Sequence, residues 1–280
     1  MSARTFSISV VLTAVVIPMI SAVSDSPPLP RNPEVPWEGD PDIGALKDER
    51  LKEIWETIVK SYRRTNPYAS PAGSMSDEPL PKDAETQEYL ITTLDKALHA
   101  ETIDWNTVYT AVLLLLGGIE PDPRIPELAR FMYQLPRPMK MSYPHGRTYV
   151  QMLCVLALHQ DATSATVLRD AVSKSFWGDY PYHDRPKEST EEAVYRMRVF
   201  ALGRLGRMSP DISIPFLEEL ARKYPYIRKE GAKESVRESE YEEWIKQNPD
   251  GFIPHEIQST LSRAYENKVK QEATSQPPKE

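Results

Sequence analysis

Two stretches of the chain repeat one another, and this recurrence limits the possible folds more than any other feature. Leu116 to Leu128 and Leu205 to Leu217 lie 89 positions apart, and Leu, Gly, Pro, Asp, Ile, Pro and Leu recur in the same order. A third, weaker copy lies at an offset of 40 from the first and matches its leucines at 153, 156 and 168. Each copy reads as an apolar helix, a short turn and an amphipathic helix. Helix pairs with a period of about 40 residues are typical of an α-solenoid.

The best-preserved copy resembles the HEAT-like repeat, particularly its short bacterial form. Arg196 to Gly206 contains an arginine followed by the helix end Ala-Leu-Gly-Arg-Leu-Gly, and Ile214 to Leu217 supplies the apolar-Pro-x-Leu step of a second helix. The match is partial over Val108 to Leu135 and poor over Tyr149 to Phe176. The three copies of the repeat together cover about 120 of the 280 residues. The resemblance implies a curved stack of helix pairs that binds proteins or serves as a spacer, and it transfers no catalytic residue.

The rest of the chain adds flanking helices and no alternating, strand-like pattern. Apolar side chains at helical spacing, or charged side chains around an apolar stripe, predict helices over Ile43 to Tyr62, Ala84 to His99, Glu230 to Gln247 and from about Pro254 onwards. We therefore expect an all-α fold, a short α-solenoid of HEAT-like helix pairs with flanking helices, over residues 42–270. Residues 271–280 are expected to form a disordered tail.

The N-terminus has the pattern of a secretory signal peptide. Arg4 is the only charged residue before Asp25, an apolar run covers Val10 to Ile17, and Pro18 precedes small residues. We expect residues 1–24 to be removed by cleavage after position 22 or 24, which places the protein in the periplasm or outside the cell. An uncleaved membrane anchor is the alternative, because a run of about 20 uncharged residues is long enough to span a bilayer.

Two proline-rich stretches interrupt the chain. Residues 25–41 contain six prolines and no apolar period, which predicts an extended tether between the export signal and the folded domain. Residues 66–83 hold four more and predict a long loop, which is unusual inside a compact domain. The sequence does not indicate what this loop does.

Charge and cysteine content exclude several classes of partner and fold. Loss of residues 1–24, with one arginine and no acidic residue, would change the net charge from −7 to −8. An acidic chain without clustered Lys and Arg argues against nucleic acid or anionic lipid as partner, and no membrane partner is expected unless the signal stays uncleaved. The single cysteine, Cys154, lies in an apolar run and is expected to be buried, so no intramolecular disulfide is possible.

Catalytic motifs are incomplete. His255 and Glu256 begin like a zinc-protease helix, but Ser259 stands where the second histidine is required. Adjacent acidic pairs such as Glu191-Glu192 diverge by about 100° on a helix, so they cannot face one substrate as acid and base. We expect no catalytic residue and no cofactor.

A recurring Tyr-Pro step is the one candidate site. It occurs once per repeat, in the connection between helix pairs, and such connections emerge on one edge of a solenoid. The simpler interpretation is that the rings cover helix ends. The alternative is an aromatic edge that binds an extended peptide or a glycan by stacking. The residues of this predicted edge are Tyr143, His145, Trp177, Tyr180, Tyr182, His183, Tyr224 and Tyr226.

Metal binding is a weaker alternative for the same edge. His145 and His183 fall at matching points of successive connections, and Asp179 or Asp184 is close in sequence. Neither histidine is followed by a ligand-type residue three or four positions later, so no metal is predicted.

The function expected from these features is that of an exported, non-catalytic scaffold that binds another protein or an extended polymer. Two alternatives stay open. One is an exported all-α enzyme that acts on polysaccharide, and the other is a purely structural spacer. An enzyme should gather titratable groups in one deep pocket, whereas a scaffold should present a shallow groove.

Overall fold

The computed structural model describes residues 39–59, 83–116, 120–183, 187–226 and 249–275, and within these ranges all regular secondary structure is helical. The all-α prediction is confirmed for this part of the chain. Several predicted features lie outside the described residues: the signal peptide 1–24, nearly all of the tether 25–41, the loop 66–83 apart from its last residue, and the helix over 230–247.

The described helices are η1 (Ile43–Ala45), α1 (Glu49–Ile54), η2 (Trp55–Val59), α3 (Ala84–Leu98), α4 (Trp105–Leu115), α5 (Arg124–Gln134), α6 (Tyr143–Leu158), α7 (Ala162–Asp170), α8 (Lys174–Trp177), α9 (Thr190–Leu205), α10 (Pro210–Lys223) and α12 (Pro249–Ser275). Most lie in the predicted segments, but the single helix predicted over Ile43 to Tyr62 is divided into three short elements, and α8 is not predicted. The three copies of the repeat correspond to the pairs α4/α5, α6/α7 and α9/α10.

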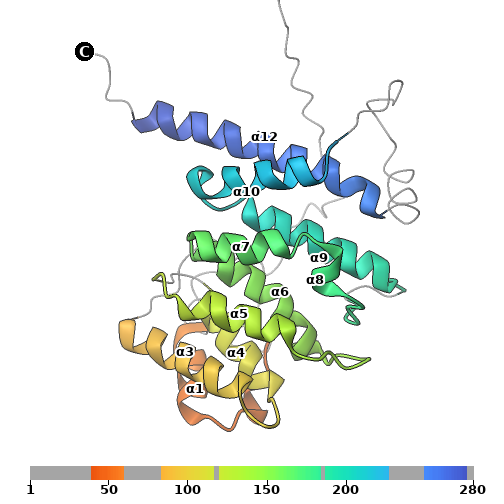
Figure 1. Ribbon diagram of the computed structural model, residues 1–280. Helices are drawn as coiled ribbons and strands as arrows, with labels where there is room; N and C mark the ends of the chain where they lie inside the picture. The colour runs from red at the N-terminus through yellow and green to blue at the C-terminus, as the bar shows by residue number, and fades with distance from the viewer. Residues whose placement is uncertain (1–38, 60–82, 117–119, 184–186, 227–248, 276–280) are drawn as a thin grey trace, which may run out of the picture.

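These pairs stack along one direction of the molecule, with α1 at one end and α12 at the other (Figure 1). The first helices α4, α6 and α9 contact one another in sequence, and α12 continues this row by contacting α9. The second helices α5, α7 and α10 form a parallel row that begins with α3. We call the row of α3, α5, α7 and α10 the second-helix layer.

Short polar side chains fix where the helices begin. The carboxylate of Asp83 accepts a hydrogen bond from the Thr86 amide at the start of α3, and Asp161 caps α7 in the same way. At the start of α9, Ser189 accepts from the Glu192 amide, while the Glu192 carboxylate accepts from the Ser189 amide at 2.7 Å. This capping box gives Glu192 a structural role at the helix start that the adjacent Glu191 does not share.

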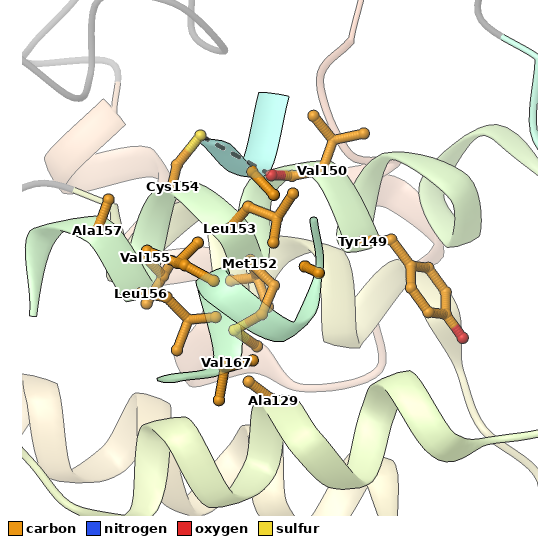
Figure 2. Close-up of a cluster of buried hydrophobic side chains, with 14 of the residues drawn as sticks. Ala129, Tyr149, Val150, Met152, Leu153, Cys154, Val155, Leu156, Ala157 and Val167 are labelled. Atoms are coloured by element: carbon orange, nitrogen blue, oxygen red, sulfur yellow. Dashed lines mark hydrogen bonds between the residues drawn. The ribbon is translucent and has the colours of Figure 1, made fainter. Parts of the chain in front are cut away.

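The core is centred on α6, which contacts α4, α5, α7 and α9. Figure 2 shows its apolar side chains beside Ala129 of α5 and Val167 of α7. Cys154 is 3% exposed, and its thiol lies 3.8 Å from the Val150 carbonyl oxygen. The expectation of a buried, free cysteine is confirmed. Burial also raises the pKa of Cys154, because a thiolate is poorly solvated in an apolar core.

The turns of successive pairs are joined by side chains that bind backbone groups of a neighbour. The amide group of Gln87 pairs with both the N–H and the carbonyl oxygen of Glu120. His159 Nε2 accepts from the Asp122 amide at 2.7 Å, and the Gln160 side chain accepts from Ser209 at 2.6 Å. Because turn amides have no helical partner, these bonds satisfy groups that would otherwise need water.

The C-terminal helix α12 closes the stack by packing on both α9 and α10. It begins five residues earlier than the predicted start at Pro254 and continues to Ser275, into the stretch expected to be a tail. Gly206 ends α9, as predicted, and a Cβ atom there would lie 2.4 Å from the methyl group of Thr260. No helix among the described residues is long and apolar enough to cross a bilayer.

Candidate functional site

The eight residues of the predicted aromatic edge divide by exposure. His145, Trp177, Tyr180 and Tyr182 are buried, Tyr224 is half-buried, and Tyr143, His183 and Tyr226 are exposed. In this arrangement the four buried rings belong to the core and would reach an outside ligand only if the core opened. Binding at the exposed members stays a prediction.

Two of these buried rings, Trp177 and Tyr180, lie with the buried ring of Tyr149 around a cation of the chain itself. The guanidinium carbon of Arg137 lies 5.3 Å from the ring centre of Tyr149, 5.8 Å from that of Trp177 and 5.7 Å from that of Tyr180. Aromatic rings at this range attract a cation through their negative faces. We call these three rings with Arg137 the arginine cage.

Arg137 also joins the ends of two helices. Its Nη2 donates to the carbonyl oxygens of Tyr133 and Phe176 at 3.2 and 3.3 Å, and its Nη1 donates to that of Trp177. Tyr133 lies at the end of α5 and the other two at the end of α8, where carbonyl groups lack helical partners. The cage therefore has the contacts of a structural clamp.

The first two Tyr-Pro steps meet at Gly146. The Tyr180 hydroxyl donates to the Gly146 carbonyl oxygen at 3.1 Å, and a Cβ atom on Gly146 would lie 2.0 Å from the Tyr182 ring. Only glycine allows this close approach. The third step lies apart from them, since Tyr226 contacts His255 of α12 with ring centres 5.6 Å apart.

His145 packs against Trp105 with ring centres 3.6 Å apart and an interplanar angle of 13°. It is 4% exposed, and its Nε2 atom has no hydrogen-bond partner among the described residues. Burial, with a smaller contribution from the positive charge of Arg137, lowers the pKa of His145 to about 4. The ring is therefore neutral at physiological pH.

Among the described residues, no three His, Cys, Asp or Glu side chains are grouped so that they could hold a metal ion.

Two grooves occupy the second-helix layer. The first, about 370 Å³ in volume, lies between α3 and α5, and the second, about 340 Å³, lies between α7 and α10 with α8 at its end. Both are open to solvent. We call them the α3/α5 groove and the α7/α10 groove.

The α3/α5 groove has an apolar floor and a polar rim. Ile91, Leu128 and Phe131 form the floor. On the rim, His99 stacks on Phe131 with ring centres 4.2 Å apart, and its Nδ1 lies 2.9 Å from a carboxylate oxygen of Asp95. The stack holds the histidine ring flat against the groove wall, with side chains of His99 and Asp95 about half exposed.

Arg124 lines the same groove, but its charge is already matched. Its two terminal nitrogens bind the Glu88 carboxylate at 2.9 and 2.6 Å, and it also binds Asp122 at 2.6 Å. Hydrogen bonds from Arg124 lower the pKa of both carboxyl groups. The remaining acidic side chain on the rim, Glu127, is exposed.

The α7/α10 groove combines two aromatic rings with hydroxyls and cations. Phe176 and Tyr224 line it, so the third Tyr-Pro step contributes one ring here. Arg169 binds Glu219 at 3.1 Å and Asp170 at 2.7 Å across the groove wall. Three further polar side chains line this groove.

Those groups are two serines and a lysine. The hydroxyl oxygens of Ser173 and Ser175 lie 2.9 Å apart, and the Lys223 ammonium lies 5.5 Å from the ring centre of Tyr224. Of the residues that line the two grooves, only Tyr224 belongs to the predicted aromatic edge. The available signals were weak: Asp95 and His99 are four positions apart on one helix, and Lys223 ends another.

Comparisons with protein-family models, with curated proteins and with solved structures found no match to this chain.

Proposed function

We propose that this protein is an exported, non-catalytic scaffold, a short α-solenoid whose second-helix layer binds an extended partner. The observation that carries the proposal is the recurrence of similar open grooves between successive helices of one layer, α3/α5 and α7/α10. A row of grooves suits a polymer that lies across several helices, which is how helical stacks use an extended surface.

The lining of the grooves also favours a binding surface. Apolar floors supply contact area, and rims of charged groups supply orientation. In both grooves an arginine is held between two carboxylates, Arg124 by Glu88 and Asp122 and Arg169 by Asp170 and Glu219. Such paired side chains are ordered before a partner arrives, which lowers the entropy lost on binding.

The solenoid part of the proposal rests on the stacking of equivalent helices. Each of α4, α6 and α9 contacts the next, and each of α5, α7 and α10 does the same, as neighbouring repeats of a solenoid do. The polar face of α12 at the end of the stack fits a terminal cap. The HEAT-like motif around Gly206 agrees with this arrangement.

The binding test is site-specific photocross-linking in the native host with the full chain. A photoreactive side chain replaces Thr92 in the α3/α5 groove or Ser175 in the α7/α10 groove, and Glu266 on the exposed face of α12 is the control. We expect one and the same product at both groove positions and none at the control. Equal products at all three positions, or none at any, would contradict the proposal and favour a spacer.

The export part is tested separately. Mass spectrometry of the protein from the native host should show a mature N-terminus after position 22 or 24. An intact Met1 would contradict cleavage and leave the uncleaved anchor.

A further inference from the structure

The α3/α5 groove carries an excess of negative charge. Glu88, Asp95, Asp122 and Glu127 supply four carboxylates at or beside it, against the single guanidinium of Arg124. The guanidinium of Arg124 is bound by the carboxylates of Glu88 and Asp122 through all three of its nitrogens. Among the described residues, Asp95 is paired only with His99 and Glu127 with no cation, so these two acidic groups face the groove without a partner of fixed positive charge.

The same groove offers a face for a cation. His99 and Phe131 form a stacked pair beside Asp95. A guanidinium or ammonium group binds well where an aromatic surface and carboxylates meet, because ring attraction and charge-assisted hydrogen bonds act together. The apolar floor can cover the methylene stem of a lysine or arginine, as such stems pack on apolar surface while the charged end stays polar.

The α7/α10 groove has the opposite preference. Both of its carboxylates, Asp170 and Glu219, are bound by Arg169. The Lys223 ammonium forms no ion pair within the described part of the chain, and the hydroxyls of Ser173 and Ser175 line the same groove. An ammonium group and two hydroxyls are donors that suit a carboxylate.

We infer that the partner is an extended polypeptide that places a basic side chain in the α3/α5 groove and an acidic side chain in the α7/α10 groove. This inference rests on the proposed function and specifies its partner. The carboxylates of Asp95 and Glu127 in one groove and the Lys223 ammonium in the other fix the direction in which the polypeptide lies across the second-helix layer. Like charges in the wrong groove would repel, so the reversed orientation is disfavoured.

The spacing of the two partner residues follows from helix packing. The grooves are two helix steps apart, because α5 and α7 lie between α3 and α10 in the layer. Packed helices are separated by about 8 to 10 Å, so the grooves lie about 16 to 20 Å apart. An extended chain rises about 3.3 Å per residue and alternates its side chains between two faces, so a separation of about six positions spans the grooves with both side chains toward the layer.

The experiment measures binding of synthetic peptides to the full chain by fluorescence polarisation. The probes are twelve-residue peptides with one arginine and one glutamate on a Ser/Gly/Tyr background. Their separation varies from two to nine positions, in both orders. We expect the tightest binding at a separation near six, in one order only. Reversing the order should weaken binding about tenfold, which is a typical loss when a pair of charge-assisted contacts is exchanged for repulsion.

Variants assign each end of the peptide to its groove. Glu127→Gln should remove the preference for arginine and keep that for glutamate, whereas Lys223→Gln should do the reverse. The double variant Glu127→Lys with Lys223→Glu should prefer the opposite order. Arg222→Gln and Glu266→Gln are matched controls at exposed positions outside the grooves and should change neither preference. All four side chains are exposed, so thermal unfolding should stay close to that of the parent chain.

The outcomes separate this inference from the proposed function. Peptide binding that ignores charge order, or a failure of all peptides to bind, overturns the inference. If cross-links nevertheless form at Thr92 and Ser175, the proposed scaffold function is supported, and the partner has a chemistry other than that of a charged peptide. If neither peptides nor cross-links appear, both fail.

Discussion

The backbone N–H of Asp122 donates a hydrogen bond to Nε2 of His159 at 2.7 Å, across 37 positions of the chain. The other ring nitrogen, Nδ1, lies 2.7 Å from the Asp161 carboxylate, which also caps α7. Since Nε2 accepts, the proton of the neutral ring belongs on Nδ1, where it is donated to Asp161. One buried side chain thus connects the α4/α5 turn to the start of α7.

Replacing this histidine should loosen the junction between two helix pairs. His159→Leu leaves the Asp122 amide without its partner, and an unsatisfied buried donor costs about 1 to 3 kcal/mol. We expect the free energy of unfolding in urea to fall by that amount. His99→Leu is the control, because that side chain is half exposed and should change stability by less than about 0.5 kcal/mol. Equal effects of the two substitutions would mean that the buried bond contributes nothing.

The arginine cage should depend on the shape of its cation as well as on the charge. Arg137→Ala removes three hydrogen bonds to helix-end carbonyls and empties the space among three rings. We expect a loss of about 2 to 4 kcal/mol in the free energy of unfolding. Arg137→Lys keeps the positive charge but lacks the planar group of N–H donors that the guanidinium presents. Its stability should therefore be reduced by more than half of the loss expected for Arg137→Ala.

The control for the cage is Arg222→Ala, an exposed arginine on α10, which should be nearly neutral. Full stability of the lysine variant would show that charge alone holds the cage. Near-ultraviolet circular dichroism, which reports on the packing of Trp177 and the tyrosines, gives an independent measurement.

Two glycines should respond in opposite directions to the same substitution. Gly146→Ala places a methyl group 2.0 Å from the Tyr182 ring, so we expect a loss of about 1 to 3 kcal/mol. Gly203→Ala in the middle of α9 meets nothing within 4 Å and should gain about 0.5 to 1 kcal/mol. In a Tyr182→Ala background the cost of Gly146→Ala should shrink, and a cost that stays the same would exclude the ring contact as its cause.

Stability should fall in mild acid because of His145. Its pKa in the folded chain is about 4, below the value of about 6.5 expected when unfolded. The folded state therefore favours the neutral ring. Between about pH 6.5 and pH 4 the unfolded chain binds a proton that the folded chain does not, so stability decreases as pH falls, by about 3 kcal/mol at most.

Urea unfolding at pH 7 and pH 5 measures this effect by difference. His145→Phe keeps an aromatic ring against Trp105 and removes the titrating group, so it should lose less stability at pH 5 than the parent chain. His255→Phe, at an exposed position, should show the parent behaviour. An unchanged acid response in His145→Phe would assign the effect to other groups.

The sequence by itself determined that the described chain is helical and where most of its helices lie. Apolar spacing and the recurrence of Leu116 to Leu128 at Leu205 to Leu217 reflect local requirements, because a helix that buries one face needs that spacing wherever it lies. For the same reason Cys154, inside a continuous apolar run, could be assigned to the core. Boundaries were less well determined, since Pro254 was read as a start but is tolerated inside the first turns of α12.

The tertiary structure alone decided how the predicted aromatic residues and the charges are used. The Tyr-Pro steps were visible in sequence, yet only packing puts Arg137 among the rings and Tyr182 against Gly146. Likewise, the sequence does not distinguish the charged side chains of Arg124 and Lys223. In the structure, Arg124 forms ion pairs with two carboxylates, whereas Lys223 forms none within the described part of the chain. Pairing of charges depends on distances between helices far apart in sequence, and a local pattern holds no information about those distances.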